Sequence, residues 1–166
     1  MSAGGLLGRC DNEPVAERLT DRDIACWVLK SRTAPEQIVP GWAAGASQTL
    51  TRCLRRSYRM ELMAPGQPCL LWLSGQQDPG VQALGRLTSA AFLPPESDPA
   101  GREASVTASL RRLEEPVPRR VLLADHVLSG AEVLRMPAGS NPSYLSPAIF
   151  EALLELLSPA DLSQFG

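Results

Sequence analysis

Lysine, serine and tryptophan side chains occur at three places in the sequence where they could together bind a flat ligand. The run CWVLKS puts Lys30 and Ser31 at the polar end of an apolar segment, directly before a long loop. That loop carries Trp42, and a second apolar run, PCLLWLSG, puts Trp72 and Ser74 on one side of an extended strand. Aromatic rings stack on nucleobases for about 1–3 kcal/mol per base. The pattern predicts a cleft for a planar ligand, with the alternative that each tryptophan belongs to the core.

Four arginines follow a helical spacing and could bind phosphate. They recur at i, i+3, i+4 and i+7, on the side opposite an apolar stripe, and this predicts a helix over 47–62. A positive helix face suits contacts to a phosphate backbone, while an ordinary solvated surface is the other interpretation. The residues concerned are Arg52, Arg55, Arg56 and Arg59.

Few residues support catalysis or metal binding. His126 is the single histidine and has no nucleophile motif such as GxSxG beside it. The four cysteines form no CxxC pair, and neither a GxxxxGKS/T loop nor a GxGxxG motif occurs. We therefore expect no enzymatic activity, no metal and no cofactor. The remaining enzymatic alternative would use Lys30 with a nearby carboxylate.

Composition describes one ordinary domain. The 166 residues are 44% hydrophobic and 20% charged, as in soluble globular proteins. A net charge of −2 argues against binding to nucleic acid by bulk electrostatics, but it leaves room for a local basic face. No run approaches the roughly 18–20 apolar residues of a membrane span, and the first residues lack the apolar core of a signal peptide. We expect a cytoplasmic protein without a membrane partner.

Hydrophobic periodicity predicts about five strands and three short helices. The expected strands are 24–31, 68–74, 81–92, 103–113 and 132–136, and the expected helices are 47–62, 121–128 and one that begins at Ser146-Pro147. Few connections suit parallel crossovers, so the fold class is α+β, with a mixed or antiparallel, partly closed sheet. We expect a loose lead-in at 1–22, one domain at 23–158 and a tail at 159–166.

The order of these segments resembles the EVE domain, a member of the PUA-like superfamily related to YTH and ASCH domains. The resemblance rests on CWVLKS, a loop tryptophan, RMELMAPGQPCLLWLSG and DPGVQALGRLTSAAF, followed by SNPSYLSPAIFEALLELL. It covers about 24–157. The arginine–asparagine motif that members carry before the first helix is missing, and Trp72-Leu73 stands where a tyrosine–histidine pair is usual.

This resemblance implies a pseudo-barrel of five to six strands whose cleft accepts a single base of DNA or RNA, modified or unmodified. Carried across by position, the residues that line or support the cleft are Trp27, Lys30, Ser31, Trp42, Trp72, Leu73 and Ser74, with Arg32 and Thr33 at its edge. The expected function is therefore a non-catalytic binding module whose partner is nucleic acid carrying a modified base. A protein-interaction or small-ligand module without a nucleic-acid role is the alternative.

Overall fold

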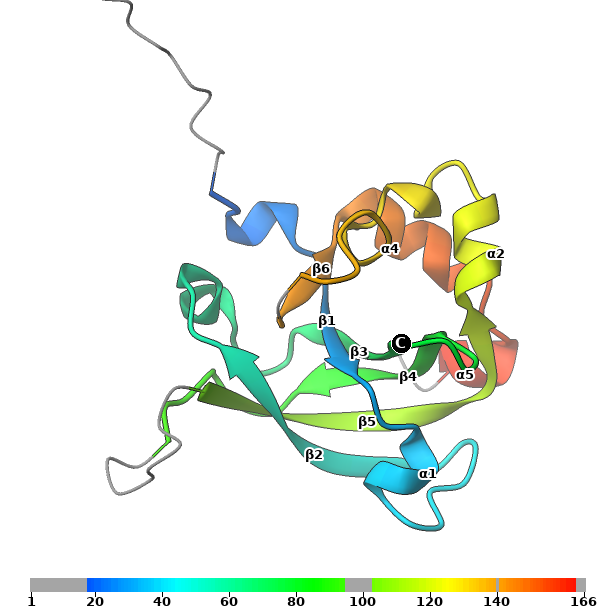
Figure 1. Ribbon diagram of the computed structural model, residues 1–166, viewed down its shortest axis with the longest axis horizontal. Coiled ribbons are helices and arrows are strands. Elements are labelled where there is room, and N and C mark those ends of the chain that lie inside the picture. Colours follow the sequence, from blue (N-terminus) through cyan, green and yellow to red (C-terminus); the bar gives the residue numbers. More distant parts are fainter. Residues whose placement is uncertain (1–17, 95–102, 140, 164–166) are drawn as a thin grey trace, which may run out of the picture.

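A single six-stranded mixed sheet forms the centre of the molecule (Figure 1). The computed structural model describes residues 18–94, 103–139 and 141–163. The strand order is β2-β5-β4-β3-β1-β6; β1 and β3 are parallel, and the other neighbours are antiparallel. The strands are β1 (Cys26–Ser31), β2 (Ser47–Arg55), β3 (Pro68–Leu73), β4 (Gly80–Leu87), β5 (Glu103–Pro118) and β6 (Ser143–Leu145). This confirms the α+β class, but the sheet is curved and not closed into a barrel.

Short helices connect and cover the strands. They are η1 (Asp21–Asp23), α1 (Pro35–Ile38), η2 (Tyr58–Leu62), α2 (Arg119–Ala124), η3 (Leu128–Gly130), α3 (Glu132–Arg135), α4 (Pro147–Leu154) and α5 (Pro159–Ser163). Helices α2 and α4 lie together beside the sheet in Figure 1. Helix α4 begins as expected after Ser146, whose hydroxyl accepts a hydrogen bond from the backbone N–H of Ile149 at 3.4 Å.

Two separate hydrophobic clusters bury the two faces of the sheet. Alternate residues of β1 belong to different clusters: Val28 packs toward α2, α3 and α4, while Trp27 and Leu29 pack on the opposite face against residues of β2 to β5. Both clusters reach β3, where Leu70 belongs to the first and Leu71 to the second. Both faces of β1 and β3 are therefore buried, which explains why these two strands read as continuous apolar runs.

The expected helix over 47–62 is wrong. Its first nine residues form β2, and only Tyr58–Leu62 form a short 3-10 helix. Leu50 and Leu54 are buried, whereas Thr49 and Thr51 are exposed, so the side chains alternate with the period of a strand. Pairing along β5 supplies the hydrogen bonds that a helix would have made internally, and the β-branched threonines favour this extended conformation.

Other expected boundaries also shift. The predicted strand at 132–136 is helix α3, and the predicted strand at 103–113 continues as β5 to Pro118. At Gly85 two strands approach each other closely, because a Cβ there would lie 1.8 Å from the carbonyl oxygen of Ser109. Residues 159–163 of the expected tail form α5 instead, and the buried Asp161 pairs with Arg111 of β5, while 164–166 lie outside the described residues. Residues 1–17 of the expected lead-in lie outside the described residues.

Candidate functional site

The carboxyl ends of β1 and β3 meet at one edge of the sheet because the two strands are parallel neighbours. Ser31 lies opposite Leu73, and the backbone N–H of Ser74 donates to the carbonyl oxygen of Ser31 at 2.8 Å. The chain continues from these positions into Arg32 on one side and the loop 74–79 on the other. The structure therefore brings together two sequence segments that were expected to share a site.

A groove of about 1180 Å³ opens at this edge. Its walls come from α1, the loop between β3 and β4, the end of β5 and the start of α2. Three of the expected site residues line it, namely Arg32, Leu73 and Ser74. The other lining residues are Ala34, Pro35, Glu36, Gln37, Gly75, Gln76, Gln77, Asp78, Pro79, Gln82, Arg112, Pro116, Pro118, Arg119, Arg120 and Leu123.

Positive charge exceeds negative charge in the groove. The guanidinium group of Arg112 makes intramolecular contacts: it pairs with Glu36 at 3.1 Å and donates to the carbonyl oxygen of Trp42. Arg32, Arg119 and Arg120 have no ion-pair partner among the described residues. These three guanidinium groups therefore remain available to an anionic ligand, on a chain whose net charge is −2.

The hydroxyl of Ser31 is used by the fold. It donates to the carbonyl oxygen of Thr33 at 2.8 Å and accepts from the backbone N–H of Thr33 at 3.0 Å, which closes a tight turn at the end of β1. Ser31 is 5% exposed and does not line the groove, and neither does the exposed Thr33. Ser31 thus positions Arg32 at the groove instead of contacting a ligand there.

Lys30 connects the carboxyl end of β1 to Gly139 and Asn141, which precede β6. Its ammonium group donates to the carbonyl oxygen of Gly139 at 2.7 Å. The side chain of Asn141 pairs with the peptide groups of Lys30: its Oδ1 accepts from the Lys30 N–H at 2.7 Å, and its Nδ2 donates to the Lys30 carbonyl at 3.0 Å. Burial lowers the pKa of Lys30, and the nearby Glu132 partly offsets that effect. Lys30 does not line the groove.

The expected pair of tryptophans at one cleft is wrong. Trp42 is 1% exposed within the cluster on the face of the sheet opposite α2, α3 and α4, and its indole N–H donates to the carbonyl oxygen of Ala46 at 2.8 Å. Trp72 is 4% exposed within the other cluster, next to the helices. Trp27 is fully buried and donates to Gln67 Oε1 at 2.7 Å. The core interpretation of all three rings therefore holds, because both faces of the sheet bury large apolar side chains.

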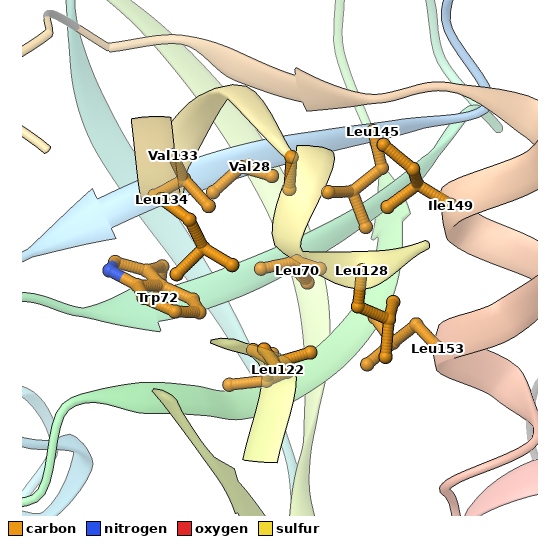
Figure 2. A pocket seen from close by; sticks show the side chains of 12 residues that line it. Val28, Leu70, Trp72, Leu122, Leu128, Val133, Leu134, Leu145, Ile149 and Leu153 are labelled. Carbon is orange, nitrogen blue, oxygen red and sulfur yellow. The ribbon is translucent and has the colours of Figure 1, made fainter. Parts of the chain in front are cut away.

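Trp72 borders a small apolar cavity, shown in Figure 2. The cavity has a volume of about 10 Å³, which is the space of about one water molecule and far too small for a base. In Figure 2 the indole nitrogen points away from the cavity, toward the end where β1 and β3 finish. Leu70, Leu122 and Leu128 close the cavity from the sheet and helices.

The four arginines expected on one helix face do not share a face. Arg52 points inward with the parity of Leu50 and Leu54, and its Nη2 lies 3.5 Å from the carbonyl oxygen of Lys30. Its Nε is buried and has no hydrogen-bond partner within the described part of the chain, and burial lowers the pKa of Arg52. Arg55 and Arg56 are exposed at the end of β2. The expected phosphate-binding face is therefore wrong, because a strand sends successive side chains to opposite sides.

Arg59 is held in an internal ion pair. Its guanidinium group donates to both oxygens of Glu132 at 2.8 Å and to the carbonyl oxygen of Pro142 at 3.0 Å. Glu132 also accepts from the hydroxyl of Ser143 at 2.9 Å. The hydrogen bonds that Arg59 donates to Glu132 raise the pKa of Arg59. Burial alone would raise the pKa of Glu132, but Arg59, Ser143 and Lys30 together hold it below its ordinary value.

The groove arginines that the sequence analysis missed are Arg119 and Arg120. They follow the run PVP, at the point where β5 ends and α2 begins. Two adjacent arginines at a proline-marked strand end were the available signal. Arg32 lies nearly ninety positions earlier in the sequence. The order of strands in the sheet brings it to the same groove, and the local sequence could not predict this.

Two other features, a membrane-spanning helix and a metal-binding cluster, are absent from the described residues. Within the described residues, no helix is long and apolar enough to span a membrane. The same part of the chain contains no group of three histidine, cysteine, aspartate or glutamate side chains arranged to hold a metal ion.

Comparisons with known proteins identify the fold. The sequence matches no protein-family model and no curated protein. A protein from Leishmania major aligns with a TM-score of 0.63 at 16% identity, over 87% of this chain and 99% of that one. The DUF55 domain of human thymocyte nuclear protein 1 aligns with a TM-score of 0.56 at 17% identity, over 79% of this chain and 97% of that one.

A second structure of the human protein, THYN1, is a complex with DNA that contains 5-methylcytosine. It aligns with a TM-score of 0.52 at 18% identity, over 81% of this chain and 99% of that one. At these identities the likeness concerns the fold. The chain is therefore folded as an EVE domain, the domain that is also called DUF55.

Proposed function

We propose that this chain is a non-catalytic nucleic-acid-binding domain that holds one unstacked base, modified or unmodified, in the groove at the carboxyl ends of β1 and β3. The observation that carries the proposal is the excess of unpaired guanidinium groups in a groove of about 1180 Å³ on a chain of net charge −2. Phosphate contacts supply most sequence-independent affinity for nucleic acid.

The composition of the groove supports binding of a nucleotide. Arg32, Arg119 and Arg120 can contact phosphate, and the groove also presents the side-chain amides of Gln76 and Gln77. No aromatic ring lines the described groove, so the stacking surface would come from guanidinium planes, which also stack on bases. The human THYN1 structure with DNA containing 5-methylcytosine gives a precedent for this ligand class on the same fold.

The chemistry of the groove favours binding over catalysis. His126 is exposed and does not line the groove; of the two carboxylates that do, Glu36 is already paired with Arg112, and Asp78 is the remaining acidic group. General acid–base catalysis needs a titratable group free to exchange a proton with the ligand. Lys30, the base of the enzymatic alternative, donates to a backbone carbonyl away from the groove.

The salt dependence of binding tests this function. Fluorescent single-stranded and duplex oligonucleotides would be titrated with the protein at several salt concentrations. Three phosphate contacts predict a slope of log K against log salt of about −2 for single strands, since each contributes about −0.7. The double variant Arg119→Glu and Arg120→Glu should weaken binding and bring the slope to about −0.7 or smaller. Arg22→Glu, an exposed change before the amino end of β1, is the control and should leave the slope unchanged.

The alternative function is a protein-interaction or small-ligand domain. The overall negative charge and the lack of an aromatic ring in the described groove favour it. Affinity that does not fall with salt, or equal binding by wild type and the double variant, would support this alternative and contradict the nucleic-acid proposal.

A further inference from the structure

We infer that Gln82 is the residue that reads the bound base, and that it selects bases carrying an exocyclic amino group, such as cytosine and adenine, over thymine, uracil and hypoxanthine. This inference rests on the proposed function of the groove. It is carried by a separate set of observations on the position, burial and hydrogen bonding of one side chain.

Gln82 is the extra residue of a β-bulge. Leu71 of β3 pairs with Ala83 of β4, but the next residue, Trp72, pairs with Val81, so Gln82 has no partner across this ladder. The pairing of β4 with β5 skips the same residue. A bulge turns a side chain out of the regular alternation, and bulges occur frequently beside binding sites. Here the bulge directs Gln82 into the groove.

The carboxamide of Gln82 is buried and only partly satisfied. The residue is 5% exposed, and its Nε2 makes one long hydrogen bond of 3.4 Å to the carbonyl oxygen of Asp78. Its Oε1 has no partner among the described residues, and it is not one of their fully buried unpaired atoms. Because Oε1 is accessible, a ligand group that donates a hydrogen bond can replace solvent there. The open Oε1 is therefore the position where a ligand would complete the hydrogen bonding.

The contact to Asp78 fixes which atom of the amide faces the ligand. A carbonyl oxygen can only accept, so the nitrogen of Gln82 must lie on that side, and the oxygen faces the groove. At that oxygen the ligand would be the hydrogen-bond donor. An exocyclic amino group projects beyond the ring and donates to a lone acceptor without a neighbouring carbonyl. The ring N–H of thymine or uracil lies between two carbonyl oxygens, which would approach Oε1 and repel it.

The surroundings of Gln82 are suited to a nucleotide. Ser74 and Arg32 come from the neighbouring strand ends, and Arg119, the first residue of α2, lines the same groove. A base that reaches Gln82 would leave its phosphate near these guanidinium groups, which bind phosphate without distinguishing sequence. Affinity and base preference are thus assigned to different residues, so they can be separated by mutation.

Matched oligonucleotides test the inference. They would be identical except for one central base, compared as cytosine against uracil, 5-methylcytosine against thymine, and adenine against hypoxanthine. Each pair exchanges an amino group for a carbonyl and a ring N–H, and the second pair also keeps the methyl group. We expect the wild type to prefer the amino-bearing member by about tenfold. Gln82→Met, which is close in volume but cannot accept this hydrogen bond, should bind both members alike.

The control is Gln48→Met, which makes the same chemical change on β2, outside the groove, and should keep the tenfold preference. A melting curve for each variant shows that it folds. Wild-type binding that depends on salt but not on the central base would overturn the role of Gln82, as would a preference that survives Gln82→Met. Absence of salt-dependent binding to every oligonucleotide would instead overturn the proposed function of the groove.

Discussion

Removal of the Arg59 guanidinium group should destabilise the fold without weakening ligand binding. Arg59→Leu keeps an apolar stem but deletes the two charge-assisted hydrogen bonds to Glu132 and the one to the carbonyl oxygen of Pro142. The remaining carboxylate keeps the hydroxyl of Ser143 as its hydrogen-bond donor. The ion pair lies away from the groove, so affinity for oligonucleotides should stay the same.

The expected loss of unfolding free energy in Arg59→Leu depends on how deeply Arg59 and Glu132 are buried. The two side chains of the ion pair are 21% and 22% exposed. Breaking a fully buried pair costs about 3–5 kcal/mol, and an exposed pair contributes about 0.2–1 kcal/mol. A pair that is mostly buried should therefore cost about 2–3 kcal/mol, which lowers the melting temperature of a chain of this length by about 5–10 °C. Replacing both Arg59 and Glu132 by leucine should recover part of the loss, because no unpaired charge then remains.

Urea denaturation at several pH values would check this prediction. The pKa of Glu132 is lower in the folded state than in the unfolded chain, so its stabilisation is present above the unfolded pKa and is lost as the pH falls through the folded pKa. The difference between wild type and Arg59→Leu should therefore be largest at neutral pH and shrink below about pH 4.5. A loss under about 0.5 kcal/mol at pH 7, or a difference that grows in acid, would refute the reasoning.

Three further substitutions test the packing. Trp42→Ala should cost about 3–5 kcal/mol of unfolding free energy, measured by chemical denaturation, and a changed affinity at unchanged stability would contradict the buried position of the ring. Gly85→Ala should cost about 3 kcal/mol because its Cβ would meet the Ser109 carbonyl; a neutral effect on melting would show that the strands can separate there. Asp161→Ala leaves Arg111 without its buried partner and should cost about 2–3 kcal/mol, whereas equal protease resistance of variant and wild type would argue that α5 is not anchored.

The sequence predicts β1 and β3, which are buried on both faces, better than β2, which is buried on one face. In β1 and β3 nearly every residue is apolar, so their assignment needed no knowledge of the partner strand. In β2 the apolar residues Leu50 and Leu54 are four apart, which fits one face of a helix and one face of a strand equally well. The threonines at positions 49 and 51 were the local signal for a strand, but the arginine spacing suggested a helix.

The sequence could predict only those groove residues that lie at or directly after the end of a recognisable strand. Arg32, Leu73 and Ser74 directly follow or end recognisable strands, and parallel pairing brought them to one groove. The indole of Trp42 could not be placed, because its burial depends on strands that close over it from other parts of the sequence. Gln82 also gave no local signal, since the bulge that directs it depends on the pairing of β4 with two other strands.

The amide of Asn141 has a consequence for how the molecule behaves among its copies. An edge strand with free peptide groups can accept another strand and begin aggregation. Strand β6 covers β1 only as far as Val28, and the Asn141 carboxamide then bonds both peptide groups of Lys30. A neighbouring copy therefore finds no free donor–acceptor pair at Lys30 onto which it could add a strand. The Asn141 side chain thus occupies the part of the β1 edge that β6 leaves uncovered.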